Sequence, residues 1–194
     1  MIKKSIIILL FIIFVFDIYF FLIQKKTNCL NERLSQKQID INIFKNQMSN
    51  LYSSESISIQ NCDLYLNNSV MNLRELSITK PILVLRFSIF NCSTCVDFTL
   101  EKLQEHFHDF ALNKRIIIVY DDENMRVSES MFGKMPYVTT NRYILGLPIE
   151  KSNIPFMFIV DSTLITKQLF IPEKGMPSLT DEYLSIIKTR YFNN

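Results

Sequence analysis

Residues 82–95 read ILVLRFSIFNCSTC, and this stretch decides the fold. Its first nine residues are apolar apart from Arg86 and Ser88, which is typical of a central β-strand buried on both faces. The strand runs into Asn91 and then into Cys92 and Cys95, two cysteines separated by two residues. A cysteine pair in this position predicts an α/β domain whose reactive site lies at the end of a central strand.

A helix is expected directly after the cysteine pair. Asn91 is of a residue type that often caps a helix N-terminus. Apolar residues then recur at intervals of three and four, as on one stripe of an α-helix. A second run of strand composition, Arg115–Tyr120, follows, so the order predicts a βαβ unit with parallel strands and a right-handed crossover. The apolar stripe comprises Val96, Leu100, Leu103, Phe107, Phe110 and Ala111.

The remaining elements complete a domain expected to span residues 57–194. Residues 178–181 resemble a capping box with Asp in place of Glu and therefore predict a C-terminal helix. The other expected elements are a hairpin over 63–71, a short helix around Asn124–Phe132, a third strand over Phe156–Val160 and an antiparallel partner over Leu164–Phe170.

The chemistry expected of the cysteine pair is thiol–disulfide exchange. The thiolate is the reactive species and a free cysteine titrates near ~8.5, so attack near neutral pH requires a lowered pKa. Backbone amides and the dipole at the helix start would lower the pKa of Cys92. Cys95, one turn further on, is expected to be more buried and less acidic, which suits the thiol that resolves a mixed disulfide.

Two other interpretations of the pair are weaker. A zinc site would need a second pair of ligands at suitable spacing, and Cys29, Cys62, His106 and His108 do not form one. A chance pair of core cysteines is a further alternative, but a strand, the pair and an amphipathic helix in succession are a much narrower coincidence. The sequence therefore predicts redox chemistry without a metal or a cofactor.

The N-terminus predicts a membrane anchor. Residues 5–23 form an apolar run of 19 residues with a single charge, Asp17, and a spanning helix needs ~20 residues. Residues 1–4 form a short tail, and no typical cleavage site follows the run, so we expect a retained transmembrane signal-anchor rather than a cleaved signal peptide. Residues 24–56 are mostly polar and are expected to form a juxtamembrane spacer, helical in part.

Charge gives little guidance on orientation or on partners. Lys3 and Lys4 before the apolar run are balanced by Lys25 and Lys26 after it. The short tail ahead of an export-like segment favours a C-terminal domain outside the cytoplasm. The net charge is only +2, and Lys and Arg occur at most as doublets, so we expect no binding to nucleic acid.

Residues from about 61 to 191 resemble the thioredoxin-like fold, and most closely its membrane-anchored TlpA/ResA-type branch of extracytoplasmic thiol–disulfide oxidoreductases. The matching features are the hairpin with residues 72–76, the strand that runs into the cysteine pair, and Ile154 and Pro155 ahead of the third strand. The resemblance implies a three-layer α/β/α domain with a central mixed β-sheet. It also implies protein thiols or disulfides as partners and a location on the periplasmic side of a bacterial inner membrane.

The resemblance further suggests a substrate contact. In that family the proline that opens the third strand is cis and lies beside the redox pair, and the backbone of the preceding residue pairs with the substrate. Carried onto this sequence, Pro155 would be cis and Ile154 would contact substrate. A simpler alternative is that Pro155 starts a strand, where proline is tolerated.

Departures from the family pattern bear on the redox direction. Asn91 stands where the family usually has Trp, and Ser93 and Thr94 replace Gly-Pro or Pro-Pro between the cysteines. Arg86 stands six positions before Cys92, where a polar or acidic residue is common. A cation there would favour the Cys92 thiolate and a more oxidising couple, unless Arg86 pairs with an acid elsewhere.

The sequence thus favours a thiol–disulfide oxidoreductase in which Cys92 is the nucleophile and Cys95 the resolving thiol. A peroxide-reducing relative would need a lone cysteine in a Pro-x-x-x-[Thr/Ser]-x-x-Cys setting, and residues 89–95 do not provide it. The alternative is a non-enzymatic thioredoxin-like module for metal delivery or assembly that uses the same dithiol and binds Cu(I) or zinc.

Overall fold

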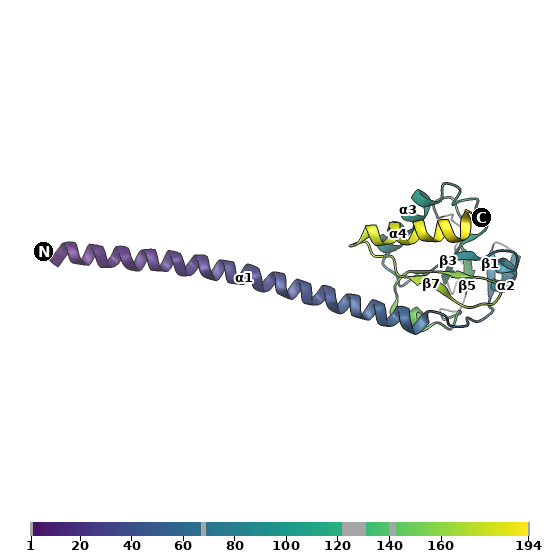
Figure 1. Ribbon diagram of the computed structural model, residues 1–194, viewed down its shortest axis with the longest axis horizontal. Helices are drawn as coiled ribbons and strands as arrows, with labels where there is room; N and C mark the ends of the chain where they lie inside the picture. The colour runs from purple at the N-terminus through teal and green to yellow at the C-terminus, as the bar shows by residue number, and fades with distance from the viewer. Residues whose placement is uncertain (1, 67–68, 122–130, 140–142, 194) are drawn as a thin grey trace. The chain divides into compact units, whose positions relative to one another are not determined.

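The computed structural model shows the chain as two units, Met1–Asn46 and Gln47–Asn194. The long helix α1 (Ile2–Ser54) makes up the first unit and ends within the second (Figure 1). The helix expected around Asn124–Phe132 lies almost entirely outside the described residues. The structure describes residues 2–66, 69–121, 131–139 and 143–193, without the side chains of residues 2–12 and 43.

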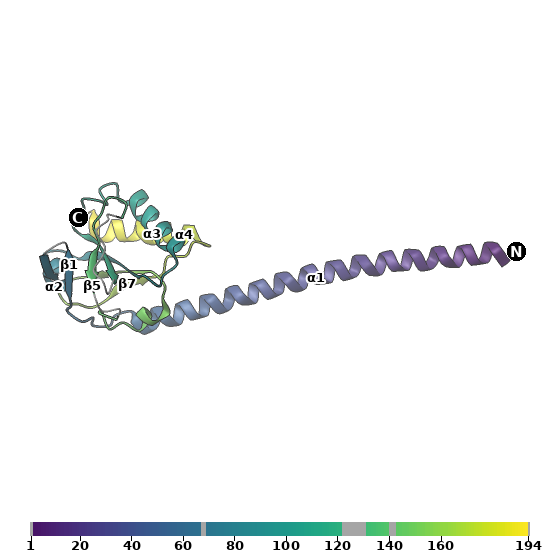
Figure 2. The same ribbon diagram turned by 180° about the vertical axis from the view of Figure 1, so that it is seen from behind.

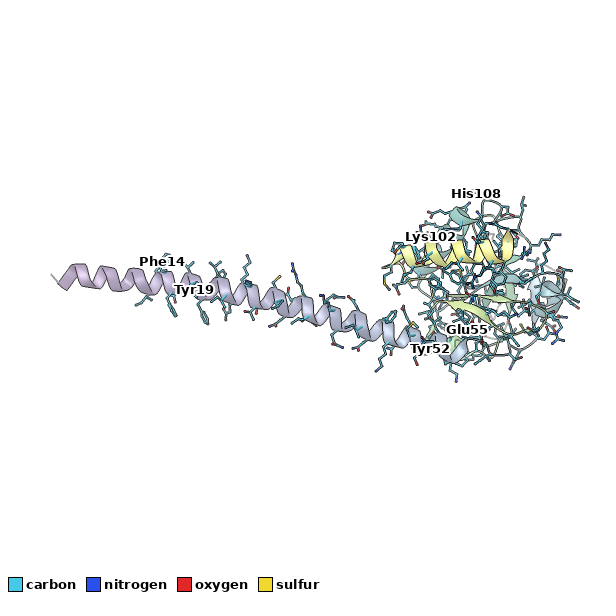
Figure 3. All side chains as sticks on the ribbon, viewed as in Figure 1. Phe14, Tyr19, Tyr52, Glu55, Lys102 and His108 are labelled. Atoms are coloured by element: carbon cyan, nitrogen blue, oxygen red, sulfur yellow. The ribbon has the colours of Figure 1, made fainter. Side chains whose placement is uncertain are left out.

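The described residues of the first unit, from Ile2 on, are all helical, so the spacer predicted over residues 24–56 is more regular than expected. Described side chains such as Phe14 and Tyr19 project away from the helix axis and are largely exposed (Figure 3). In the part of the chain whose side chains are described, no helix is both long and apolar enough to cross a membrane. The predicted span, residues 5–23, lies partly outside that portion.

The second unit includes the last turns of α1, which the sequence had assigned to the spacer. Ser54 is fully buried: its hydroxyl accepts a hydrogen bond from the Ile149 N–H (3.1 Å), and its carbonyl accepts one from the Thr166 hydroxyl (2.7 Å). The Glu55 carboxylate accepts a hydrogen bond from the Gln168 N–H at 2.9 Å (Figure 3). These contacts join the helix end to the domain.

A mixed sheet of seven strands forms the centre of the second unit, in the order β2-β1-β5-β4-β3-β6-β7. β3 and β4 are parallel, as predicted for a βαβ unit, whereas β6 pairs antiparallel with β3 and β7 antiparallel with β6. The strands are β1 (Asp63–Leu66), β2 (Ser69–Asn72), β3 (Ile82–Ser88), β4 (Ile116–Asp121), β5 (Tyr137–Thr139), β6 (Phe156–Val160) and β7 (Lys167–Phe170).

Every residue of β3 is buried because its side chains alternate between two cores. Leu83, Leu85 and Phe87 pack in the core beneath α3 (Ser93–His106) and α4 (Pro177–Ile187). These two helices lie on one side of the sheet in both views (Figures 1 and 2). Ile82 and Val84 pack in the core on the other face.

That other face is covered by shorter pieces than a three-layer α/β/α domain implies. Leu73 comes from the helix α2 (Leu73–Ser77), and Ile149 from the 3-10 helix η1 (Pro148–Ser152). Connecting segments supply most of the rest, including Leu145 and Leu164. The predicted central mixed sheet is confirmed. Of the two helical layers expected on its faces, one consists of the long helices α3 and α4, and the other consists of short helices and loops. β3 thus lies between the parallel strand β4 and the antiparallel strand β6.

Both ends of α3 differ from the prediction. Cys92, not Asn91, is the N-cap residue of α3. The Asn91 side chain instead accepts a hydrogen bond from the Ser88 N–H at 2.7 Å and so stabilises the turn before the helix. The helix ends at His106, so Phe107 and Phe110 of the predicted stripe are buried beyond it.

The capping box predicted over residues 178–181 is also wrong. α4 begins at Pro177, whose fixed φ suits the first position of a helix, and its N-cap, Met176, makes no side-chain capping bond. The Asp181 carboxylate instead pairs with Lys102 at 3.0 Å and with His106 at 3.1 Å. These contacts link α4 to α3. The last helical turn, η2 (Lys188–Phe192), continues from α4.

Candidate active site: the Cys92–Cys95 pair

A tight turn delivers Cys92 from the end of β3 to the start of α3. The Asn91 N–H donates to the Ser88 carbonyl at 3.0 Å, and the Phe90 N–H donates to the Ser88 hydroxyl at 3.2 Å. The Cys95 N–H then donates to the Cys92 carbonyl at 3.0 Å, which closes the first turn of the helix. The two cysteines, both free thiols, therefore lie together at one end of α3, as the sequence predicts.

Cys92 is the exposed and acidic member of the pair. Its pKa falls to about 7, first because of a hydrogen bond with the Cys95 thiol and then because of the Thr94 hydroxyl, 3.1 Å from the Cys92 sulfur. The backbone N–H groups of Cys95 and Thr94 lower the pKa further. The helix-start amides thus contribute as expected, but the largest contribution comes from the neighbouring side chains. A substantial fraction of the molecules therefore carry Cys92 as a thiolate at neutral pH.

Cys95 is the more protected and more basic member. Its pKa rises to about 11 because it hydrogen-bonds Cys92 and because it is partly desolvated, with further contributions from the charges of Cys92 and Glu173. Its backbone carbonyl accepts a hydrogen bond from the Thr99 hydroxyl at 2.8 Å, which fixes this residue in the helix. The two thiols therefore differ in acidity in the direction that the nucleophile and resolving roles require.

Arg86 lies in a buried ionic cluster on the sheet face opposite α3. The residue is 2% exposed. Its guanidinium lies 3.3 Å from the Asp121 carboxylate and 3.5 Å from the Glu150 carboxylate, and it also donates to the Phe87 carbonyl. Arg86 therefore pairs with acids, the alternative left open above, and it is not among the largest influences on the pKa of Cys92.

The same cluster sets the environment of Cys62. The pKa of the Cys62 thiol is raised to about 11, chiefly by burial; the charge of Glu150 also raises it, whereas Arg86 lowers it. Burial also raises the pKa of Glu150, although Arg86 and the N–H groups of Leu147 and Leu145 act against it. Cys62 is thus a shielded thiol in the core, whereas Cys29 is exposed on α1.

Ile154 lies near the turn that carries Cys92, but the cis bond predicted at Pro155 is wrong. The described residues contain no cis peptide bond. Asn153, in the left-handed region (φ 55°, ψ 36°), redirects the chain between η1 and β6, and the buried Pro155 leads into β6 through a trans bond. Ile154 lines a small cavity with Ser88 and Asn91. Substrate contact at Ile154 and Pro155 remains a prediction.

A cleft of about 410 Å³ lies next to the turn between β3 and α3, and it was not predicted from the sequence. Ile89 and Phe132 are 53% and 38% exposed at its rim. The only available signal was that Ile89 and Phe90 continue the apolar run of β3 past Ser88, where the strand ends and the turn exposes them. The lining comprises Phe87, Ser88, Ile89, Asn91, Ser93, Val96, Asp97, Leu100, Tyr120, Met131 and Phe132.

The thiols have no further metal-ligating partners in the described parts of the chain. No group of three or more Cys, His, Asp or Glu side chains in a metal-binding arrangement occurs there. His106, considered above as a ligand, lies 3.1 Å from Asp181 on the α3–α4 side. The site as described is a dithiol at a helix start, beside an apolar cleft.

Comparison of this chain with known proteins finds solved structures that are similar in fold, but it does not assign the chain to a family. No family model and no curated protein matches the chain. Among solved structures, an uncharacterized thioredoxin-like protein from Porphyromonas gingivalis is 14% identical, with 73% of this chain and 98% of that chain covered and a TM-score of 0.44. A putative thiol:disulfide interchange protein DsbE from Chlorobium tepidum is 8% identical (69% and 96% covered, TM-score 0.43). Apo Sco1 from Thermus thermophilus is 12% identical (71% and 95% covered, TM-score 0.43). Identities and TM-scores this low carry no information about activity, which has to be inferred from the site itself.

Proposed function

We propose that this protein is a thiol–disulfide oxidoreductase that exchanges disulfides with other proteins through Cys92 and Cys95. The observation that carries the proposal is the asymmetry of the pair: one thiol is exposed and acidic, and its neighbour one turn away is half-buried and basic. A structural dithiol has no need of that difference, whereas an exchange catalyst depends on it.

In the first step the Cys92 thiolate attacks one sulfur of a substrate disulfide. A mixed disulfide forms between Cys92 and that sulfur, the substrate S–S bond breaks, and the second substrate sulfur leaves as a thiolate that takes up a proton. The Thr94 hydroxyl, 3.1 Å from the Cys92 sulfur, stabilises the attacking thiolate in the free protein. A pKa of about 7 keeps that thiolate populated at neutral pH without making it a poor nucleophile.

In the second step Cys95 loses its proton and attacks the Cys92 sulfur. The Cys92–Cys95 disulfide forms, the mixed disulfide breaks, and the substrate leaves as a dithiol. Two electrons and two protons have then passed from this protein to the substrate, and the reverse sequence oxidises a substrate dithiol. Formation of the mixed disulfide removes the thiolate charge of Cys92, which is one cause of the raised pKa of Cys95. Attack by Cys95 is therefore easier in the mixed disulfide than in the free dithiol.

The apolar cleft suits the chain that flanks a substrate cysteine. It opens beside the turn of Ser88 and Asn91, and Ile89 at its rim is more than half exposed. An apolar side chain of the substrate could be buried there while the neighbouring sulfur meets Cys92. Ile154, which lines a small cavity with Ser88 and Asn91 of the same turn, would contact the substrate backbone.

Reduction of insulin by dithiothreitol, followed with the full chain in detergent, tests the exchange activity. The wild type should accelerate the reaction, and Cys92→Ser should abolish the acceleration. Incubated with insulin in the absence of dithiothreitol, Cys95→Ser should instead accumulate a mixed disulfide, visible as a mass increase that later addition of dithiothreitol removes. Cys29→Ser, which removes an exposed thiol outside the site, is the matched control and should behave as the wild type. Equal activity of Cys92→Ser and the control would refute the proposal.

We further propose that the chain is tethered to a membrane by residues 5–23, with the thiol site on the extracytoplasmic side. The support is the sequence of that segment, 19 residues with one charge. In intact cells, a membrane-impermeant maleimide should label the exposed Cys92 without disruption of the membrane, in a background where Cys29 is replaced by Ser. Labelling that appears only after the cells are opened would place the domain in the cytoplasm.

A further inference from the structure

The part of α1 between residues 27 and 46 exposes a regular apolar stripe. Among the described side chains of this segment, five large apolar ones are exposed, and four of these follow the spacing of a heptad repeat, with Ile39 as the exception. These four are Leu30, Leu34, Ile41 and Phe44, which are 56%, 57%, 58% and 54% exposed.

A stripe of this kind is what a helix presents to a partner helix. Most of the stability of a helix in a protein comes from packing of its apolar face rather than from intrinsic propensity. In the described single chain, Leu34 and Ile41 remain more than half exposed, so this face has no such packing. Apart from Ile39 and Ile43, the residues around them are mostly polar, as on the outer face of a coiled coil.

We propose that this segment pairs with the same segment of a second copy of the chain, as a parallel two-stranded coiled coil. The heptad places Leu34 and Ile41 at a positions and Leu30, Lys37 and Phe44 at d positions. A β-branched residue at a and leucine at d favour two strands in a parallel coil, and Ile41 and Leu30 follow that preference.

Charge complementarity supports a parallel, in-register pair. In that arrangement each g residue faces the e residue five positions later in the other chain. Asp40 then faces Lys45 of the partner copy, an opposite-charge pair that occurs twice in the dimer. The other g residues, Lys26 and Arg33, face neutral Asn31 and Gln38, so no like charges meet. Within its own helix, Asp40 accepts a hydrogen bond from the Gln36 amide at 3.0 Å.

Lys37 is the polar residue within the apolar seam. Its long aliphatic stem can cover apolar surface while the ammonium group reaches water at the edge of the seam. A single polar core position costs stability but restricts register and the number of strands. Lys37→Leu should therefore strengthen pairing several-fold, and Leu34→Asp should abolish it.

Disulfide cross-linking of the full chain, in the membrane or detergent fraction where it is recovered, tests the pairing. The background carries Cys29→Ser, Cys92→Ser and Cys95→Ser, so the outcome is independent of exchange activity. Leu34→Cys places a thiol at an a position in the seam, and Glu32→Cys places one at the outward f position of the same turn. With copper phenanthroline as oxidant, Leu34→Cys should give a covalent dimer in several-fold higher yield than Glu32→Cys.

A charge exchange tests the orientation. Added to Leu34→Cys, Asp40→Lys should lower the yield of covalent dimer, because Lys45 of the partner would then face a like charge. The combination of Asp40→Lys with Lys45→Asp should restore it. Equal yields at positions 32 and 34, no covalent dimer at either, or no recovery in the combined charge exchange would each overturn the parallel coiled coil.

Discussion

Two regions at the ends of the central strands contain cysteine beside ionisable groups, and they differ in almost every property. At the start of α3, Cys92 is exposed and its pKa is lowered to about 7 by hydrogen bonds from Cys95 and Thr94. On the opposite face of the sheet, Cys62 is buried near Arg86 and Glu150, and its pKa is raised to about 11. The same side chain is thus reactive in one region and inert in the other.

The difference shows that exposed hydrogen-bond donors, rather than a nearby cation, make the reactive thiol here. Arg86 is the only arginine near the end of β3 in sequence, yet its charge is shared between Asp121 and Glu150 within the core. For Cys62, desolvation outweighs the favourable charge of Arg86. Burial therefore decides the outcome in the core, and local donors decide it at the surface.

The largest expected effect is on thiol reactivity across the two regions. At pH 7 the thiolate fraction of Cys92 should exceed that of Cys62 by roughly three to four orders of magnitude, given pKa values of about 7 and about 11. Alkylation by iodoacetamide, resolved by peptide mass spectrometry, should rise for Cys92 as the pH passes 7 and stay negligible for Cys62 in the folded protein. Comparable labelling of Cys92 and Cys62 would contradict the proposed difference in reactivity between the exposed and the buried thiol.

The next largest effect concerns the stability of the buried cluster. Arg86→Leu leaves the Asp121 and Glu150 carboxylates buried without their cation, which should lower the free energy of unfolding by about 3–5 kcal/mol. Urea unfolding measures the loss. The Cys92 alkylation profile should remain centred near pH 7 in this variant, and an upward shift would show that Arg86 does act on the thiolate.

Lys102→Met provides the control for that measurement. The Lys102 ammonium lies 2.7 Å from the Glu105 carboxylate and 3.0 Å from the Asp181 carboxylate. The substitution therefore also removes a cation from two carboxylates. These carboxylates are 60% and 40% exposed, and water can solvate them when the cation is lost. The expected cost is below about 1 kcal/mol. A similar loss of unfolding free energy in both variants would mean that burial does not increase the cost of removing the cation from the Arg86 cluster.

The comparison also shows which features a single sequence can reveal. The central strand, the cysteine pair at a helix start and the parallel partner strand follow from local patterns and are confirmed, although the strand predicted over residues 82–90 ends at Ser88. The direction of the difference in acidity between Cys92 and Cys95 was predicted from their positions at a helix start, although side-chain hydrogen bonds contribute most of the lowering at Cys92. These features depend on residues close together in the chain.

Features that depend on distant residues were missed or wrong. The partners of Arg86 stand 35 and 64 positions away, and nothing local indicates that Glu150 would reach it. The cis bond at Pro155 was carried over from a family, whereas the turn here is made by Asn153 in the left-handed region. The burial of Ser54 at the end of α1 likewise depends on Ile149 and on hydrogen bonds across the fold.

The smallest expected effect separates the donors within the reactive region. Thr94→Val removes the hydroxyl 3.1 Å from the Cys92 sulfur and should raise the pKa of Cys92 by about half a unit, since water replaces part of the lost hydrogen bond at this exposed position. Alkylation at pH 6 should slow correspondingly, because less thiolate is present there. Ser93→Ala, in the same turn, is the control and should leave the profile nearly unchanged, since Ser93 is not among the largest influences on this pKa. An equal shift in both variants would attribute the lowered pKa to the helix start as a whole and not to the Thr94 hydroxyl.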